Sequence, residues 1–359
     1  MNISCDGIVN NPLGGASYVF EKEIIPYLLG NLNKNKLKIS VGAQPNSSPH
    51  FGTLETITLA FALARKIEDY DPKKQVTILY EVIETAPSET IVIDGIKYQK
   101  NLNFTGKIDN YFGEYIDILD YYKNKTNINY EIRYQYEFNA HPETKSVFKS
   151  ILNNREYISE KLDQKYKNLR VRMSCPICGL TDKNSVLNKY TEDTITFYCP
   201  EHGNYSINVN DDISKIEYNS PLRNLIRGMS YTAVNHSHDY DYEILRITGS
   251  DYAGFYQEEL RYKLASYLGC NVYNMSMIFY APLVVDWSGA KLSKSLYVKE
   301  GAYQDIPKKF INYSFLKEAL GYKGLEILYD IVLNWINNPY MLFRHYSIYY
   351  FMEEFKKYE

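Results

Sequence analysis

Hydrophobic and polar residues in the first part of the chain follow the pattern of a strand–helix–strand unit. Residues 37–43 form a short apolar run that predicts a buried strand, and the β-branched residues of 75–83 predict a second. Between them, the turn-forming residues 44–49 precede residues 54–70, whose apolar positions recur at helical spacing. This order predicts a parallel sheet. Residues 16–32 predict an amphipathic helix ahead of the first strand.

The middle of the chain breaks this pattern. Residues 89–99 predict a hairpin that turns at Asp94 and Gly95. Residues 105–170 are rich in Tyr, Lys and Asn, and their weak periodicity predicts a mostly helical segment. Residues 172–210 hold most of the cysteines. This stretch therefore predicts an insertion into the α/β unit.

Regular α/β signals return in the last third of the chain. Residues 242–249 and 276–287 predict strands, and residues 253–269 predict a helix between them that ends at Gly269. The tail from residue 307 is predicted to be helical, with a break at residues 337–339. We therefore predict an α/β protein with a doubly wound parallel sheet. The expected parts are a first half at 1–85, an insertion at 86–240, a second half at 241–300 and a helical C-terminal segment at 301–359.

Composition narrows the class of protein. The 359 residues are 45% hydrophobic and 23% charged, which excludes a disordered, collagen-like or coiled-coil chain as an overall description. No apolar run is long enough for a membrane helix, and the N-terminus does not resemble a secretory signal, so the cytoplasm is the expected compartment. With 40 basic and 43 acidic residues, the net charge of −3 gives no global attraction to nucleic acid. A local basic surface, and hence tRNA as a partner, stays open.

The cysteines predict a metal site rather than disulfides. Cys175 and Cys178 are two residues apart, as are Cys199 and His202, and 20 residues separate the two pairs. Such doubled pairs place four soft ligands on two tight turns, the arrangement of a structural zinc ribbon. The alternative is four side chains that bind no metal. Two further cysteines, Cys5 and Cys270, are isolated and are expected to be buried free thiols.

A first candidate phosphate site follows the first predicted strand. Pro49, His50, Gly52 and Thr53 stand where a loop leads into the next helix. In open parallel sheets this is the edge at which ligands bind, and the free amides of a helix N-terminus suit a phosphate. His50 would donate a hydrogen bond to a phosphate oxygen, and Gly52 would allow close approach. The alternative is a surface or helix-capping histidine.

A second candidate follows the last predicted strand. Lys291, Ser293, Lys294 and Ser295 lie on a glycine-containing loop, residues 288–295. Two lysines and two small hydroxyl residues would suit a triphosphate and the charge of a leaving pyrophosphate. The alternative is a solvated surface loop.

Together the two elements resemble the motifs of class I aminoacyl-tRNA synthetases. His50-Phe-Gly-Thr53 is similar to their H-I-G-H-type motif, and Lys291-Leu-Ser-Lys-Ser295 to their K-M-S-K-S-type motif, in the same order. The resemblance implies a split Rossmann fold in which residues 86–240 form the connective insertion. It is closest to class I lysyl-tRNA synthetases, which carry a cysteine-rich metal segment there and a Gly-x-Asp turn similar to Gly249-Ser250-Asp251. It covers residues 35–300 as scattered motifs.

The resemblance also implies an activity. His50 and Gly52 would hold the ATP phosphates and adenine, and Lys291 and Lys294 would stabilise the departing pyrophosphate. Asp251 would lie near the ribose or the amino acid, with a helix N-cap as its alternative role. Magnesium is the expected companion of the phosphates. The implied reaction is attack of an amino-acid carboxylate, lysine being favoured by the resemblance, on the α-phosphorus of ATP.

The sequence departs from the family pattern at several positions. Thr53 stands where the family has histidine or asparagine, and Tyr252 where the lysine enzymes have histidine. Residues 221–231 lack the tryptophans that those enzymes have in this segment. Leu296 directly follows the second motif, whereas the family usually has glycine or a basic residue close to this position. The segment after Ser295 is shorter than the helical domain with which relatives read an anticodon, so anticodon reading is not expected.

Four functions are compatible with these residues. The first is amino-acid activation with tRNA as the acceptor, and the second is activation with a small molecule, peptide or carrier as the acceptor. The third is an inactive binding module, and the fourth is another nucleotidyltransferase, such as a cytidylyltransferase. A lysine substrate would require an acid for its ammonium group, and the candidates near strand ends are Glu81, Glu84 and Asp286.

Overall fold

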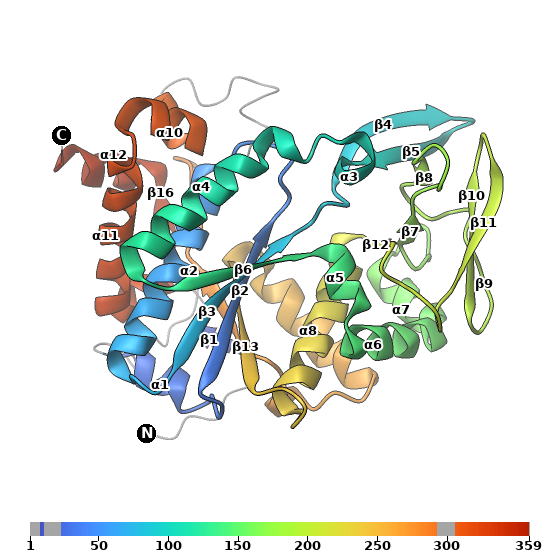
Figure 1. The fold of residues 1–359 in the computed structure, drawn as a ribbon, viewed down its shortest axis with the longest axis horizontal. Helices are drawn as coiled ribbons and strands as arrows, with labels where there is room; N and C mark the ends of the chain where they lie inside the picture. Colours follow the sequence, from blue (N-terminus) through green and yellow to red (C-terminus); the bar gives the residue numbers. More distant parts are fainter. Residues whose placement is uncertain (1–7, 11–22, 293–305, 359) are drawn as a thin grey trace.

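A computed structural model describes residues 8–10, 23–292 and 306–358 of the chain (Figure 1). At its centre lies a parallel sheet whose described strands follow the order β1-β14-β13-β2-β3-β6. The bounds are β1 (Ile8–Asn10), β14 (Ile278–Ala281), β13 (Tyr242–Gly249), β2 (Lys36–Ala43), β3 (Gln75–Val82) and β6 (Asn129–Tyr134).

The strand order makes this a split Rossmann sheet. From β2 the sheet grows in one direction through β3 and β6, and after the insertion it grows in the other direction through β13 and β14. The order therefore reverses between β2 and β13, where neighbouring connections leave on opposite faces and a crevice opens at the carboxyl ends of the strands. The predicted α/β fold with a doubly wound parallel sheet is confirmed.

Both faces of the sheet are covered, because apolar side chains alternate along its strands. In β13, Leu245 and Ile247 pack into the core shared with α2, whereas Ile244 packs into the core shared with α8. The first core also contains side chains of α1 (Ile25–Leu29), α2 (Phe51–Tyr70) and α4 (Asp109–Thr126). The second contains side chains of α8 (Ser220–His236) and of the π-helical stretch η3 (Phe255–Ala265), which η2 (Ser250–Tyr252) precedes and η4 (Val272–Asn274) follows.

The C-terminal segment is helical, as predicted, and completes the first core. Trp335 is fully buried there and stacks on Tyr346 with ring centroids 4.3 Å apart. A short strand pair, β15 (Val284–Val285) with β16 (Tyr346–Ser347), joins this segment to the end of the sheet. The helices are η5 (Lys308–Phe310), α10 (Tyr313–Leu320), α11 (Lys323–Asn337), η6 (Pro339–Phe343) and α12 (Ile348–Lys356).

The inserted residues form small separate sheets and short helices. Figure 1 shows the ribbon of β10 and β11 at the opposite end of the molecule from the C-terminal helices. The described small sheets have the orders β4-β5-β8, β11-β10-β9 and β12-β7. Their strands are β4 (Pro87–Ile93), β5 (Ile96–Asn101), β7 (Val171–Met173), β8 (Thr181–Asp182), β9 (Lys189–Tyr190), β10 (Thr194–Cys199), β11 (Gly203–Asn208) and β12 (Ile216–Tyr218). The helices are α3 (Leu102–Thr105), α5 (Gln135–Ala140), α6 (Pro142–Asn153) and α7 (Arg155–Leu162).

Strand β6 was not expected from the sequence. Residues 105–170 were predicted to be mostly helical and to lie within the insertion 86–240, but Asn129–Tyr134 pairs with β3 and extends the central sheet. Its side chains are exposed or half-buried, so it carries no apolar run to mark it as a strand. Pairing with the edge of β3 decides its conformation. The division into four parts stays a prediction.

Two further details differ from the expected elements. The strand predicted over 276–287 is interrupted at Pro282, so that β14 joins the central sheet and β15 pairs elsewhere. The helix predicted over 16–32 is described only from residue 23, and residues 25–29 are helical. Among the described helices, none has both the length and the apolar character that crossing a bilayer requires.

Gly42 permits the close approach of β2 to β3 beside the crevice. A Cβ atom at this position would lie 2.4 Å from the backbone oxygen of Glu81. We expect Gly42→Ala to lower the free energy of unfolding by about 1–3 kcal/mol, because the two strands must separate. Gly113→Ala is the matched control: Gly113 lies in α4 with open space around it, so this change should stabilise the protein by up to about 1 kcal/mol. Denaturant unfolding measures both, and equal stabilities of the two variants would contradict the prediction.

Candidate active site

A cavity of about 410 Å³ opens where the strand order reverses. Its wall combines the ends of β2 and β13, the first turn of α2 and one face of α8. The predicted residues His50, Gly52, Thr53, Asp251 and Lys291 all lie in this wall, although more than 200 residues separate the first from the last. The position agrees with the general rule that ligands bind open α/β sheets at the switch point.

His50 both caps α2 and faces the cavity. Its Nδ1 accepts a hydrogen bond of 3.3 Å from the backbone N–H of Thr53, and in the neutral ring the proton then resides on Nε2. A Cβ atom at position 52 would lie 3.3 Å from the His50 ring, so Gly52 gives that ring its room. His50 therefore has the capping role expected as its alternative and also lines the cavity, and its role towards a phosphate stays a prediction.

The C-terminal segment holds this loop in place. The backbone N–H of Phe51 donates to the carbonyl of Ile311 at 3.1 Å, and the N–H of Tyr313 donates to the carbonyl of Pro49 at 2.8 Å. Pro49 thus contributes through its backbone and is not among the residues of the cavity wall. The Ser314 hydroxyl lies 3.0 Å from that of Ser48 and donates to Glu114 at 2.8 Å. No pattern in the sequence indicates this contact.

We expect Ser314 to act as a positioning residue for His50. For the ATP-dependent reaction that the motif resemblance implies, Ser314→Ala should lower kcat about 10-fold with little change in KM, because small displacements of an aligned group are costly. Ser314→Thr, which keeps the hydroxyl, should restore kcat. Ser206→Ala removes an exposed hydroxyl pair in the ribbon and is the control. A Ser314→Ala enzyme with wild-type kcat would show that the contact supports only stability.

Lys291 and Asp251 form an ion pair at the mouth of the cavity. Lys291 Nζ lies 2.6 Å from Asp251 Oδ2 and 5.6 Å from the centre of the Tyr252 ring. The side chains are 42% and 26% exposed, and ion pairs this accessible are weak. An anion that enters the cavity can therefore compete with Asp251 for Lys291. Gly249 permits this arrangement, since a Cβ atom there would lie 2.7 Å from Asp251 Oδ1.

Part of the second candidate element lies outside the described residues. Ser293, Lys294, Ser295 and Leu296 belong to the segment 293–305, so their predicted roles stay predictions.

For Asp251, capping of the following helix was the alternative to a role in the site. The structure shows no side-chain capping bond at the start of η2 or of η3, and the carboxylate instead pairs with Lys291.

A buried carboxylate lies deeper in the cavity. Glu81 Oε1 is 2.5 Å from a nitrogen of Arg133, and Glu81 Oε2 is 2.9 Å from Arg227 Nε. Ser40 donates to the same carboxylate at 3.0 Å. Burial opposes its ionisation, but Arg227 and Arg133 outweigh this effect and hold the pKa of Glu81 well below its usual value. Glu81 is therefore a charged group whose two oxygens are already engaged.

The other acids proposed for a lysine substrate are engaged as well. Glu84 is buried and accepts hydrogen bonds from the backbone N–H groups of Gln135 and Tyr136. Asp286 accepts from the backbone of Ser288 and Ala290 within its own turn. Neither appears in the cavity wall. Within the described part of the chain, each of the three candidate acids therefore already has hydrogen-bond or ion-pair partners.

Sequence reasoning missed the arginines of the cavity. Arg223 and Arg227 are one helical turn apart on α8, next to the buried Leu222 and Ile226. Arginines that lie next to apolar residues on a buried helix indicate that charged groups are buried with them. Arg246 gave a similar signal, since it interrupts the apolar run of β13.

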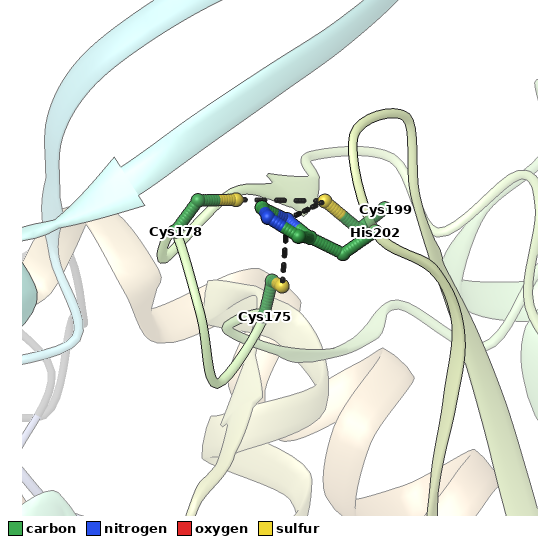
Figure 2. A group of neighbouring side chains, drawn as sticks. All are labelled: Cys175, Cys178, Cys199 and His202. Carbon is green, nitrogen blue, oxygen red and sulfur yellow. Dashed lines mark hydrogen bonds between the residues drawn. The ribbon is translucent and has the colours of Figure 1, made fainter.

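The four residues of the predicted metal site lie together. Figure 2 shows the three sulfur atoms and the histidine ring converging on one point, and their donor atoms all lie within 4.8 Å of one another. Cys178 Sγ is 3.5 Å from Cys199 Sγ, and His202 Nδ1 is 3.7 and 3.6 Å from the sulfurs of Cys175 and Cys199. A tetrahedral ion with bonds of about 2.3 Å to sulfur needs edges of about 3.7 Å. The cluster can hold a metal ion such as zinc.

Two separate turns supply these ligands. Cys199 and His202 flank the tight turn between β10 and β11, and Cys175 and Cys178 lie in the loop before β8. Gly179 and Gly203 follow the pairs with φ of 75° and 74°, a conformation that favours glycine. Cys270 lies apart from the cluster and is half-buried, which raises the pKa of its thiol. Cys5 lies outside the described residues.

Comparisons with known proteins give fold-level similarity only. No family model matches the sequence, and a search of curated proteins finds no relative. Similar solved structures include a candidate arginyl-tRNA synthetase of Campylobacter jejuni (12% identity, TM-score 0.36) and a glutamate-tRNA synthetase of Elizabethkingia anophelis (14%, 0.35). The alignments cover 85% and 83% of this chain, which spans 66% and 61% of those chains. At these TM-scores the fold assignment rests on the strand order and the position of the cavity.

Proposed function

We propose that this protein is a class I aminoacyl-tRNA-synthetase-like ligase that activates an amino acid with ATP. One observation carries the proposal. The His50-Phe-Gly-Thr53 turn at the start of α2 and the Lys291–Asp251 pair line a single cavity at the point where the strand order reverses. Either element alone is compatible with a surface loop, but their convergence from distant parts of the sequence is what a phosphate-transfer site requires.

The residues present suit each partner of the reaction. The ATP phosphates would lie against the free amides at the N-terminus of α2, with His50 Nε2–H donating to a phosphate oxygen. One carboxylate oxygen of the amino acid attacks the α-phosphorus and forms an acyl–phosphate bond. The bond from the α-phosphorus to the bridging oxygen breaks, and pyrophosphate leaves with the electron pair. Lys291, released from Asp251, would neutralise that charge. Magnesium bound to the phosphates would supply further charge neutralisation.

We further propose that the cysteine cluster holds structural zinc. Cys175, Cys178, Cys199 and His202 provide four protein ligands, which leaves no open position for a substrate. The ion would fasten the turn of the β10–β11 hairpin to the loop before β8, beside a small apolar cluster that includes Tyr98 and Leu180. Further along the hairpin, Ile195 and Phe197 of β10 pack into the second core.

Two acceptors are compatible with the proposal. The motif resemblance favours transfer of the aminoacyl group to a tRNA 3′ end, and a small molecule or carrier is the alternative. Trapping with hydroxylamine tests activation independently of the acceptor. We expect ATP-dependent formation of an aminoacyl hydroxamate, whereas its absence with every amino acid would contradict activation. Acid gels with total tRNA then separate the acceptors, because only tRNA charging shifts the mobility of the RNA.

A further inference from the structure

The cavity wall contains more basic than acidic side chains. Arg223, Arg227, Arg246 and Lys291 are basic, whereas Glu81 and Asp251 are acidic. Lys291 is paired with Asp251 and Arg227 with Glu81, which Arg133 also contacts from outside the wall. Among the described residues, Arg223 and Arg246 form no ion pair in the cavity, although the charge of Arg246 also helps to lower the pKa of Glu81.

Arg223 is the more deeply buried of these two arginines. Its side chain belongs to a residue only 6% exposed, and its Nε is buried without a hydrogen-bond partner in the part of the chain that the structure describes. Burial and the neighbouring Arg227 lower the pKa of Arg223 to about 9, so it still carries its charge at neutral pH. Arg246 Nε is buried and unpartnered as well. Buried guanidinium groups without acceptors are costly, and a bound anion would offset that cost.

The arginines lie away from the proposed ATP end of the cavity. Arg246 pairs in register with Ser40 inside the sheet, three residues before Gly249 at the end of β13. Three residues of strand span about 10 Å. Arg223 reaches the cavity from α8, which packs into the second core, whereas α2, whose first turn follows His50, packs into the first core on the other face of the sheet. An amino acid whose carboxylate meets ATP at the strand ends would therefore direct its side chain towards Arg223 and Arg246.

We infer that the amino acid activated by this protein has a negatively charged side chain, and that Arg223 and Arg246 bind this charge. That the amino acid is activated rests on the proposed function, whereas the binding of its charged side chain by the two arginines does not. A lysine side chain would place an ammonium group beside two unpaired guanidinium groups, at a site where Glu81 is already neutralised. Planar guanidinium groups suit both a carboxylate and a phosphoryl group, so glutamate, aspartate and O-phosphoserine share the required chemistry.

Binding should be measured on the full chain before turnover. Isothermal titration should be carried out with and without a non-hydrolysable ATP analogue. The ligands are glutamate, aspartate, O-phosphoserine, glutamine, asparagine and lysine. Because glutamine and asparagine have nearly the shapes of glutamate and aspartate, the comparison shows whether the side-chain charge decides binding. We expect one anionic amino acid to bind at least about 30-fold more tightly than its neutral amide or lysine. In Arg223→Gln that advantage should fall at least about 10-fold, and in Arg155→Gln, a change on α7 outside the cavity, it should stay within about 2-fold. The melting temperature of Arg223→Gln should rise or stay constant, because an unpaired buried charge is removed.

The outcomes distinguish this inference from the proposed function. Tight binding of an anionic amino acid without pyrophosphate exchange would support the inference and contradict activation. Exchange with lysine or a neutral amino acid would support activation and overturn the inference. Binding of no anionic amino acid to the wild-type protein would also overturn it. So would a loss of ATP affinity in Arg223→Gln with unchanged amino-acid preference, since the arginines would then serve the nucleotide.

Discussion

Replacing Lys291 by alanine is expected to lower kcat of amino-acid activation about 100- to 1000-fold, the usual effect of losing one preorganised charge at a reacting centre. Lys291 lies in the wall of the same cavity as the α2 turn, and its ammonium group contacts the partly exposed Asp251 and the ring of Tyr252. The lysine is thus positioned before ATP binds and free to follow the charge that develops on pyrophosphate. ATP binding should weaken only a few-fold, because the α2 amides and His50 remain. Steady-state kinetics of ATP–pyrophosphate exchange measure both parameters.

The matched control removes a similar ion pair elsewhere. Lys36 lies 2.5 Å from Asp241, both side chains are exposed, and neither residue is in the cavity wall. Lys36→Ala should leave kcat unchanged. Both variants should melt close to the wild-type temperature, since exposed ion pairs contribute at most about 1 kcal/mol. A Lys291→Ala enzyme with kcat within about 3-fold of wild type would contradict the assigned role, because loss of one such charge costs far more.

Replacing Cys199 by serine is expected to release the metal and to loosen the turn end of the ribbon. Structural zinc sites contribute about 10–16 kcal/mol to the folding of small metal-bound domains. The four ligands join the turn of the ribbon to the loop before β8, whereas Ile195 and Phe197 hold the rest of β10 in the second core. Wild-type protein should contain one equivalent of zinc by mass spectrometry, and Cys199→Ser well below half. Hydrogen exchange should show that amides of β10 and β11 lose protection while those of β2 and β3 keep theirs.

Cys270→Ser is the control for this experiment. Cys270 is a free thiol outside the cluster, so its loss should leave metal content and exchange rates unchanged. Equimolar zinc in the Cys199→Ser protein would contradict the proposed ligand set. Zinc loss without any change in ribbon protection would contradict the structural role assigned to the ion.

The sequence predicted what depends on local pattern. β2, α2, β3 and β13 were found because each carries an apolar run or a helical repeat that is buried in the sheet layers. The cluster of three cysteines and a histidine was predicted because two-residue spacing forces two donors onto one turn. The hairpin at Asp94 and Gly95 followed from its turn residues, which have φ of 49° and 77°.

What the sequence could not show depends on distant contacts. β6 is a strand because β3 offers an open edge, and nothing in its own half-exposed residues requires that conformation. The anchoring of the His50 loop by Ser314 joins positions that only the packed C-terminal segment brings together. The charge of Arg223 becomes informative only once its burial is known, because arginine in a sequence usually indicates a solvated surface.

The central claim is most directly tested by ATP–pyrophosphate exchange on the zinc-loaded full chain, with each standard amino acid and O-phosphoserine, in the presence and absence of total tRNA. The account predicts exchange that depends on one amino acid with a negatively charged side chain and that is lost in Lys291→Ala. No exchange in any reaction, from folded protein of full metal content, would contradict amino-acid activation.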